Sequence, residues 1–72
     1  MEKYKYFVPL AISPWFVVFN LYQCDILNPS NGRLINKNGI VSHSIWTLNE
    51  MNGCVKSKQW KEIDKAEAAL II

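Results

Sequence analysis

Residues 7–22 read FVPLAISPWFVVFNLY, and the structure of this uncharged stretch decides the fold. A helix that spans a bilayer needs about 20 consecutive apolar residues. This stretch is shorter, and Pro9, Pro14 and Asn20 interrupt it. Proline inside a helix costs about 3 kcal/mol. We therefore expect two buried strands separated at Ser13-Pro14, and no membrane span. Lysines precede the stretch as in an export signal, but no small-residue cleavage site follows it, so export to the cell surface ranks last.

Two strands of different kinds are predicted on either side of Ser13-Pro14. Residues 3–8 alternate between lysines and tyrosines, which is typical of a half-buried strand. That strand should lie at an edge of the sheet or end at Pro9, because proline cannot donate to a ladder. Residues 15–21 are aromatic and β-branched on both faces, as in a central strand. We expect this second strand to continue toward Ile26 and Leu27.

Two turn signals follow and predict a meander. Asn28–Gly32 combines Pro with Asn-Gly, and Asn36–Gly39 ends in a second Asn-Gly-like pair. These residues preset or tolerate the backbone angles of tight turns. Residues 33–35 and 40–45 can then return as strands.

The last third of the chain predicts helices. Thr47 and Glu50 fit a capping box, and Gly53 suits the left-handed position after a short helix over residues 48–52. Residues 59–63 can form a short strand. Asp64 then fits the N-cap of a final helix near residues 65–72. The elements together predict an α+β fold in one domain, residues 1–72: an antiparallel meander of three or four strands with these two helices.

Composition limits the functions that such a domain can have. The chain has 72 residues, half of them apolar, and a net charge of +2. A core of this size supplies only about 3–5 kcal/mol. There is more apolar side chain than one small core can hide, which indicates self-association or a partner surface. The charge is too weak to argue for nucleic acid by itself.

No group of residues indicates catalysis. His43 lies between Ser42 and Ser44, but neighbouring strand residues point to opposite faces, so it cannot easily activate either serine. Asp25 is a lone acid beside the apolar stretch, and a partner such as Arg33 or a lysine across the hairpin would satisfy it if it is buried. We predict that the chain is not an enzyme, and an enzyme ranks third among the functions.

No metal site or cofactor is predicted either. Cys24, His43 and Cys54 fall short of the four ligands of structural zinc. There is no glycine-rich phosphate loop. We expect both cysteines to be reduced, partly buried thiols, with a single disulfide as the alternative.

The nucleic-acid alternative depends on two segments in which lysines and aromatic residues interleave, residues 3–7 and 56–61. Their basic residues are Lys3, Lys5, Lys56, Lys58 and Lys61. Exposed aromatics can stack on bases while lysines track phosphates. In the first segment, however, alternation sends tyrosines and lysines to opposite faces. In the second, the acids Glu62 and Asp64 follow at once and would weaken attraction to phosphate.

The favoured function is protein binding. Trp15, Trp46 and Trp60 are the candidate partner-binding residues, because tryptophan dominates interface hot spots; core packing is the alternative for each. The strand–turn–strand order before Trp60–Asp64 and a short helix resembles small accessory proteins of phages and mobile elements. That resemblance implies a modulator of a larger protein. We predict a cytoplasmic interaction protein (in the host cytoplasm if it is phage-encoded) that binds a larger protein or forms a homodimer.

Overall fold

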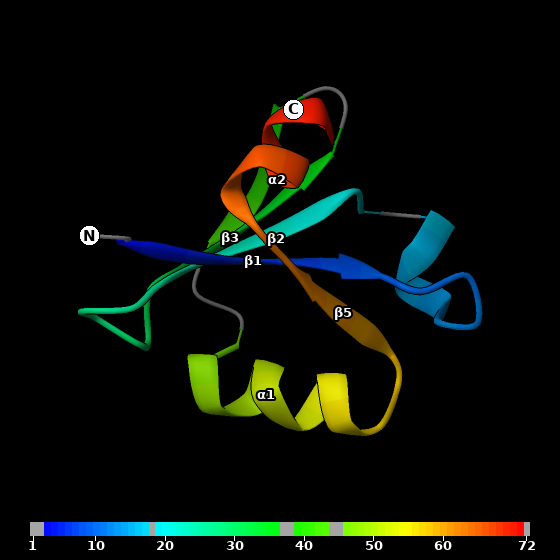
Figure 1. The fold of residues 1–72 in the computed structure, drawn as a ribbon, viewed down its shortest axis with the longest axis horizontal. Coiled ribbons are helices and arrows are strands. Elements are labelled where there is room, and N and C mark those ends of the chain that lie inside the picture. Colours follow the sequence, from blue (N-terminus) through cyan, green and yellow to red (C-terminus); the bar gives the residue numbers. More distant parts are fainter. Residues whose placement is uncertain (1–2, 18, 37–38, 44–45, 72) are drawn as a thin grey trace.

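A computed structural model describes residues 3–17, 19–36, 39–43 and 46–71 of the chain. In these residues it contains five strands, two α-helices and one short 3-10 helix (Figure 1). In chain order they are β1 (Tyr4–Pro9), the 3-10 helix η1 (Pro14–Val17), β2 (Leu21–Asp25), β3 (Gly32–Asn36), β4 (Gly39–His43), α1 (Leu48–Lys56), β5 (Trp60–Ile63) and α2 (Lys65–Ile71). The predicted α+β class is confirmed, with a small antiparallel sheet and two helices.

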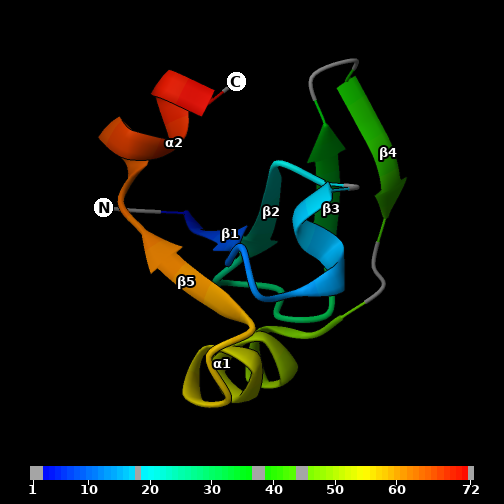
Figure 2. The ribbon, with the colours of Figure 1, turned by 90° about the vertical axis from the view of Figure 1, so that its right-hand side faces the viewer.

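The strands form one antiparallel sheet in the order β4-β3-β2-β1-β5. β1 to β4 make the predicted meander, and β4 ends the sheet on one side (Figure 2). α1 then carries the chain to the other side, where β5 pairs with β1. The segment predicted as a possible short strand thus adds a fifth strand to the meander. As a result β1 has a strand on each side. We expected either an edge strand or a strand that ends at Pro9, and the second is found.

Pro9 is tolerated in a central strand because its missing N–H is not needed there. It pairs with Trp60, and the N–H of the next residue, Leu10, donates to the carbonyl of Gln59 at 3.0 Å. Hydrogen-bonded and non-bonded pairs alternate along an antiparallel ladder. The Pro9–Trp60 pair is therefore a non-bonded one, in which β5 requires no donor from residue 9.

The two faces of the sheet carry two separate cores, with α1 on one face and α2 on the other (Figure 1). Successive residues of β1 divide between them: Phe7 packs on the α1 side and Tyr6 on the α2 side. The α1 core consists of Phe7, Phe19, Tyr22, Cys24, Leu34, Met51 and Trp60. The α2 core consists of Tyr6, Leu21, Ile35, Ile63 and Ala68. Burial on both faces explains the apolar runs in the sequence.

The strand predicted over residues 15–21 is wrong in the described part except at Leu21, its last residue. Residues 14–17 form η1 instead, and β2 begins only at Leu21. β1 and β2 are antiparallel neighbours, joined by a connection from Leu10 to Asn20 that must reverse the chain. Pro14 stands at the first position of η1, where its fixed φ and missing N–H cost nothing. The aromatic and β-branched composition predicted a strand, but it reflects burial only at Phe19 and Leu21 among the described side chains, and Phe16 is exposed.

The helix α1 is one turn longer than predicted, so the prediction that Gly53 ends it is wrong. The Thr47–Glu50 capping box is present in both directions, and the helix continues past Gly53 to Lys56. Its C-cap is Ser57, and the left-handed position expected for glycine is taken by Lys58, with φ of 64°. The N-cap of α2 is as predicted, since the Glu67 N–H donates to Asp64 Oδ1 at 2.8 Å.

The predicted second turn and fourth strand lie partly outside the described residues. Asn36 pairs with Gly39, whose φ of 119° favours glycine. β4 covers residues 39–43 and so overlaps the strand predicted over residues 40–45 at residues 40–43. Residues 37–38 and 44–45 are outside the described part.

Candidate functional site

The candidate site is an apolar groove of about 310 Å³ at the end of β1. β1, η1, the segment before β2 and the C-terminal turn of α2 all contribute to it. Its lining residues are Val8, Pro9, Phe16, Phe19, Asn20 and Ile71. Segments from both ends of the chain meet here, which is why the sequence alone does not reveal the groove.

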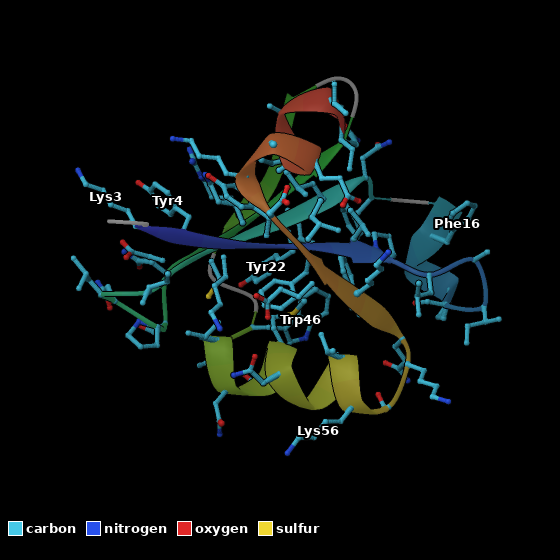
Figure 3. The ribbon with its side chains drawn as sticks, viewed as in Figure 1. Lys3, Tyr4, Phe16, Tyr22, Trp46 and Lys56 are labelled. Carbon is cyan, nitrogen blue, oxygen red and sulfur yellow. The ribbon has the colours of Figure 1, made fainter. Side chains whose placement is uncertain are left out.

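Local hydrogen bonds in the β1–β2 connection hold Phe16 at the groove. The Ser13 N–H donates to the Leu10 carbonyl at 2.8 Å, and the Phe16 N–H donates to the Ser13 carbonyl at 3.1 Å. These bonds close two consecutive turns. Phe16 is left 52 % exposed and lies at the margin of the fold, away from the Tyr22–Trp46 pair (Figure 3). A phenyl ring in that position is accessible to a partner.

The groove is uncharged as well as apolar. None of its lining residues is ionisable, and Asn20 is the single polar one among them. Its volume is at the lower end of ligand pockets, which hold about 300–1,000 Å³. Such a groove accepts a few apolar side chains, and it offers no counter-charge to a phosphate or a charged peptide.

Other large apolar side chains of the described residues are exposed as well. Ile12, in the loop before η1, is 79 % exposed, and Leu70, beside Ile71 in α2, is 87 % exposed. Leu27 is also 80 % exposed, but it belongs to the β2–β3 turn and does not line the groove. Side chains of this size are costly to leave in water when they are contiguous.

The predicted tryptophans do not form a common surface in the described part of the chain. Trp60 is 1 % exposed and lies in the α1 core, so its side chain is not accessible to a partner. Trp46 is half-buried and packs edge-on against Tyr22 and Trp60, with ring centroids 5.6 and 5.9 Å apart. The backbone of Trp15 is in η1 next to Phe16, and its side chain is outside the described part. Phe16 therefore replaces the tryptophans as the leading candidate.

The predicted basic residues are spread over separate parts of the fold. Lys3 precedes β1 and Lys5 lies in it, whereas Lys56 ends α1 and Lys58 follows its C-cap. Figure 3 shows Lys3 and Lys56 in separate parts of the fold. Lys61 is on β5. Lys5 also forms an ion pair with Glu62 at 3.8 Å. These lysines do not make one continuous basic surface.

The tyrosines of β1 lie on the opposite face of the sheet from Lys5. The alternation in the sequence predicted this arrangement. Tyr6 is 9 % exposed in the α2 core, and Tyr4 packs against the same core. Lys5 pairs with Cys24 on the α1 side of the sheet. Interleaving along the sequence thus places Lys5 and the two tyrosines on opposite faces of the sheet.

A second, polar hollow of about 220 Å³ lies where β1, β5 and α2 meet. It is lined by Tyr4, Lys5, Tyr6, Glu62, Ile63, Asp64 and Lys65. Three of its four charged residues have structural roles: Lys5 pairs with Glu62, and the Asp64 carboxylate caps α2. Lys65 is the fourth charged residue of the lining.

The nucleophiles and acids that the sequence singled out have structural roles where they are described. Burial raises the pKa of the Cys24 thiol, which lies 3.7 Å from the Pro29 carbonyl oxygen as a weak donor. A raised pKa keeps the thiol protonated and unreactive. Asp25 does not pair with Arg33, which was one of its expected partners. Its Oδ1 instead accepts the N–H groups of Leu27 and Asn28 at 2.9 and 3.3 Å. The Arg33 guanidinium instead donates to Gln23 Oε1. The side chains of Ser42, His43 and Ser44 lie outside the described part.

In the described residues no helix combines the length and apolar character needed to cross a membrane. The chain matches no protein-family model, no curated protein and no solved structure.

Proposed function

We propose that the chain is a small non-enzymatic interaction protein that binds an apolar segment of a larger protein through the groove of Val8, Pro9, Phe16, Phe19, Asn20 and Ile71. The observation that carries the proposal is the exposure of Phe16 at the mouth of an uncharged hollow. Exposed apolar patches mark interaction sites, and aromatic side chains are over-represented among the residues that dominate binding.

The chemistry of the groove selects the class of partner. Nucleic acid and acidic or basic peptides need counter-charges, and none of the lining residues carries one. An apolar segment of another protein needs only shape and burial. The dispersed lysines do not favour the nucleic-acid alternative, which stays an outcome of the test. We place the binding in the cytoplasm, supported by the unpaired thiols of Cys24 and Cys54.

The test compares two charge substitutions on exposed apolar residues. Phe16→Glu alters the groove, and Leu27→Glu is the matched control at a similarly apolar but distant turn. Each tagged variant and the natural protein are used for affinity capture from the native lysate, with nuclease, at low and high salt. Any captured partner is then purified and titrated against all three proteins.

We expect one partner to survive nuclease and high salt, and its affinity to fall at least tenfold for Phe16→Glu and not for Leu27→Glu. Both substitutions replace exposed residues, so unfolding free energies should stay within about 0.5 kcal/mol of the natural protein. Equal binding by both variants would exclude the groove. Recovery of nucleic acid, or loss of every partner in salt, would favour the lysine segments instead.

A further inference from the structure

The two helices differ in how firmly they are held on the sheet. Met51 of α1 is fully buried in the α1 core, and Cys54 and Val55 also pack against that core. In α2 only Ala68 is buried. An alanine side chain removes less apolar surface from water than a methionine does, so it contributes less to docking. Figure 1 shows the two helices on opposite faces of the sheet, and α1 therefore gives α2 no support.

α2 is also too short to be stable on its own. It has seven residues, Lys65–Ile71, and isolated helices shorter than about 12–15 residues are marginal in water. Its first turn is closed by Asp64, whose carbonyl accepts the Ala68 N–H at 3.0 Å. Its last turn has little cover, since Leu70 is exposed and Ile71 is 37 % exposed. Segments with so few buried side chains open locally while the rest of the protein stays folded.

Ile71 connects this helix with the groove. Among the described lining residues it is the one that α2 supplies, and the other five lie between Val8 and Asn20. When α2 is docked, Ile71 forms a wall of the groove, and when α2 leaves the sheet, that wall is lost. An apolar occupant that contacts Ile71 therefore binds the docked state more tightly than the open one. This difference in affinity couples the two equilibria, and the coupling is reciprocal.

We propose that α2 is a movable wall of the groove: it docks and releases while the sheet stays folded, and an apolar occupant of the groove holds it docked through Ile71. The release of α2 follows from its sparse burial alone. The effect of an occupant rests on the proposed function, because it needs an apolar group in the groove. Undocking of α2 weakens the binding of the partner, which makes this helix a control point for the groove.

Hydrogen exchange of the full chain, followed by mass spectrometry, tests the release of α2. We expect the amides of residues 68–71 to exchange about tenfold faster than those of residues 51–56 in α1, because local opening exposes α2 without unfolding the sheet. Equal exchange rates in the two helices would overturn the proposal.

Two matched variants separate undocking from simple fraying of the last turn. Ile71→Ala and Leu70→Ala each shorten an apolar side chain of α2, but only Ile71 lines the groove. Alanine favours the helix at both positions, so faster exchange reports lost docking. We expect residues 68–71 to exchange about threefold faster in Ile71→Ala than in the natural protein, with no such change in Leu70→Ala. Equal effects of the two variants would contradict a role of Ile71.

An uncharged probe tests the coupling to the groove. N-acetyl-leucinamide presents an apolar side chain, and N-acetyl-glycinamide is the control without it. Labelling with 4-fluorophenylalanine places fluorine on Phe16 and Phe19 in the groove and on Phe7 in the α1 core. We expect the leucine probe to shift the fluorine signals of Phe16 and Phe19, to leave that of Phe7 unchanged, and to slow exchange at residues 68–71.

The outcomes separate this proposal from the proposed function. Shifted Phe16 and Phe19 signals with unchanged or faster exchange at residues 68–71 would overturn the control by α2 and leave the groove as a binding site. Unshifted signals up to the solubility limit of the probe would count against the groove, and so against an occupant that holds α2. The exchange of the two α2 variants would still decide whether the helix releases. Slowing that persists in Ile71→Ala would mean that the probe acts elsewhere, and would overturn the coupling.

Discussion

The Tyr22 hydroxyl is hydrogen-bonded to both backbone groups of Trp46. It accepts the Trp46 N–H at 3.2 Å and donates to the Trp46 carbonyl. The two rings meet edge-on, with centroids 5.6 Å apart. One side chain of β2 thereby fixes the residue that precedes the capping box of α1, and so the position of the helix over the sheet.

Removing this hydroxyl should destabilise the fold. Tyr22→Phe keeps the ring and its packing but leaves the N–H and carbonyl of Trp46 without this partner. An unsatisfied, partly buried polar group costs about 1–3 kcal/mol. Urea unfolding followed by tryptophan fluorescence measures the loss. Stability within a few tenths of a kcal/mol of the natural protein would mean that water replaces the hydroxyl.

Alanine in place of glycine should have opposite effects at two positions. A Cβ at Gly32 would overlap the Tyr22 phenol group, whereas one at Gly53 meets nothing within 4 Å. We expect Gly32→Ala to cost about 1–3 kcal/mol, as overpacking does. Gly53→Ala, inside α1, should stabilise by about 0.5–1 kcal/mol. Thermal unfolding of both variants tests the pair, and a gain at Gly32 would contradict the close approach of Tyr22.

The two hydrogen bonds of the α1 capping box should stabilise the fold cooperatively. Glu50 N–H donates to Thr47 Oγ1 at 3.2 Å, and Thr47 N–H donates to Glu50 Oε1 at 2.9 Å. Loss of an N-cap side chain costs about 0.5–2 kcal/mol. We expect Thr47→Ala to lie in that range, and Thr47→Ser to be close to the natural protein. A double-mutant cycle with Glu50→Ala should show coupling, and purely additive losses would argue against reciprocal bonds.

The left-handed residue after α1 predicts an unusual response to glycine. Lys58 has φ of 64°, a conformation that costs a residue with a Cβ about 1–2 kcal/mol. Lys58→Gly relieves this cost but adds freedom to the unfolded chain, worth about 0.5–1 kcal/mol. We expect a net gain below about 1 kcal/mol in urea unfolding. The same change at Lys56, the last residue of α1, should cost up to about 1 kcal/mol, because glycine is a poor helix former.

Stability should fall in alkaline solution. Burial raises the pKa of Cys24 and of Cys54 above the ordinary value of 9.0, and that of Tyr22 above 10.0. The folded state then binds more protons than the unfolded state once the pH exceeds the unfolded pKa, so unfolding becomes easier as the pH rises. This contribution is fully present below about pH 8.5–9. Urea midpoints from pH 7 to pH 11 measure the decline, and Cys24→Ala should make it shallower. A flat profile in the natural protein would contradict the burial of these groups.

The groove illustrates why the candidate site could not be predicted from the sequence. The sequence predicted an excess of apolar surface and assigned it to the tryptophans, whereas the candidate groove is built around Phe16. Phe16 stood inside a predicted strand, and Ile71 near the end of a predicted helix. Their meeting depends on the placement of β5 and α2 beside β1, to which no local pattern refers. The nearest local signal was Ser13-Pro14, since proline at that position is typical of a helical turn.

Local chemistry was sufficient where an element is stabilised by its own neighbours. This holds for the Thr47–Glu50 and Asp64–Glu67 caps, for the turn after Asp25 and for the alternation in β1. Each involves residues only a few positions apart. The sequence by itself therefore determined the class, most strands and both helix starts. Tertiary structure decided the rest, because there the stabilising free energy comes from residues distant in the sequence. η1 replaces a strand because β1 must reverse into β2. α1 continues through Gly53 because Met51 and Val55 pack on the sheet. Trp60 is buried for the same reason, since β5 joins β1 on the far side of the meander.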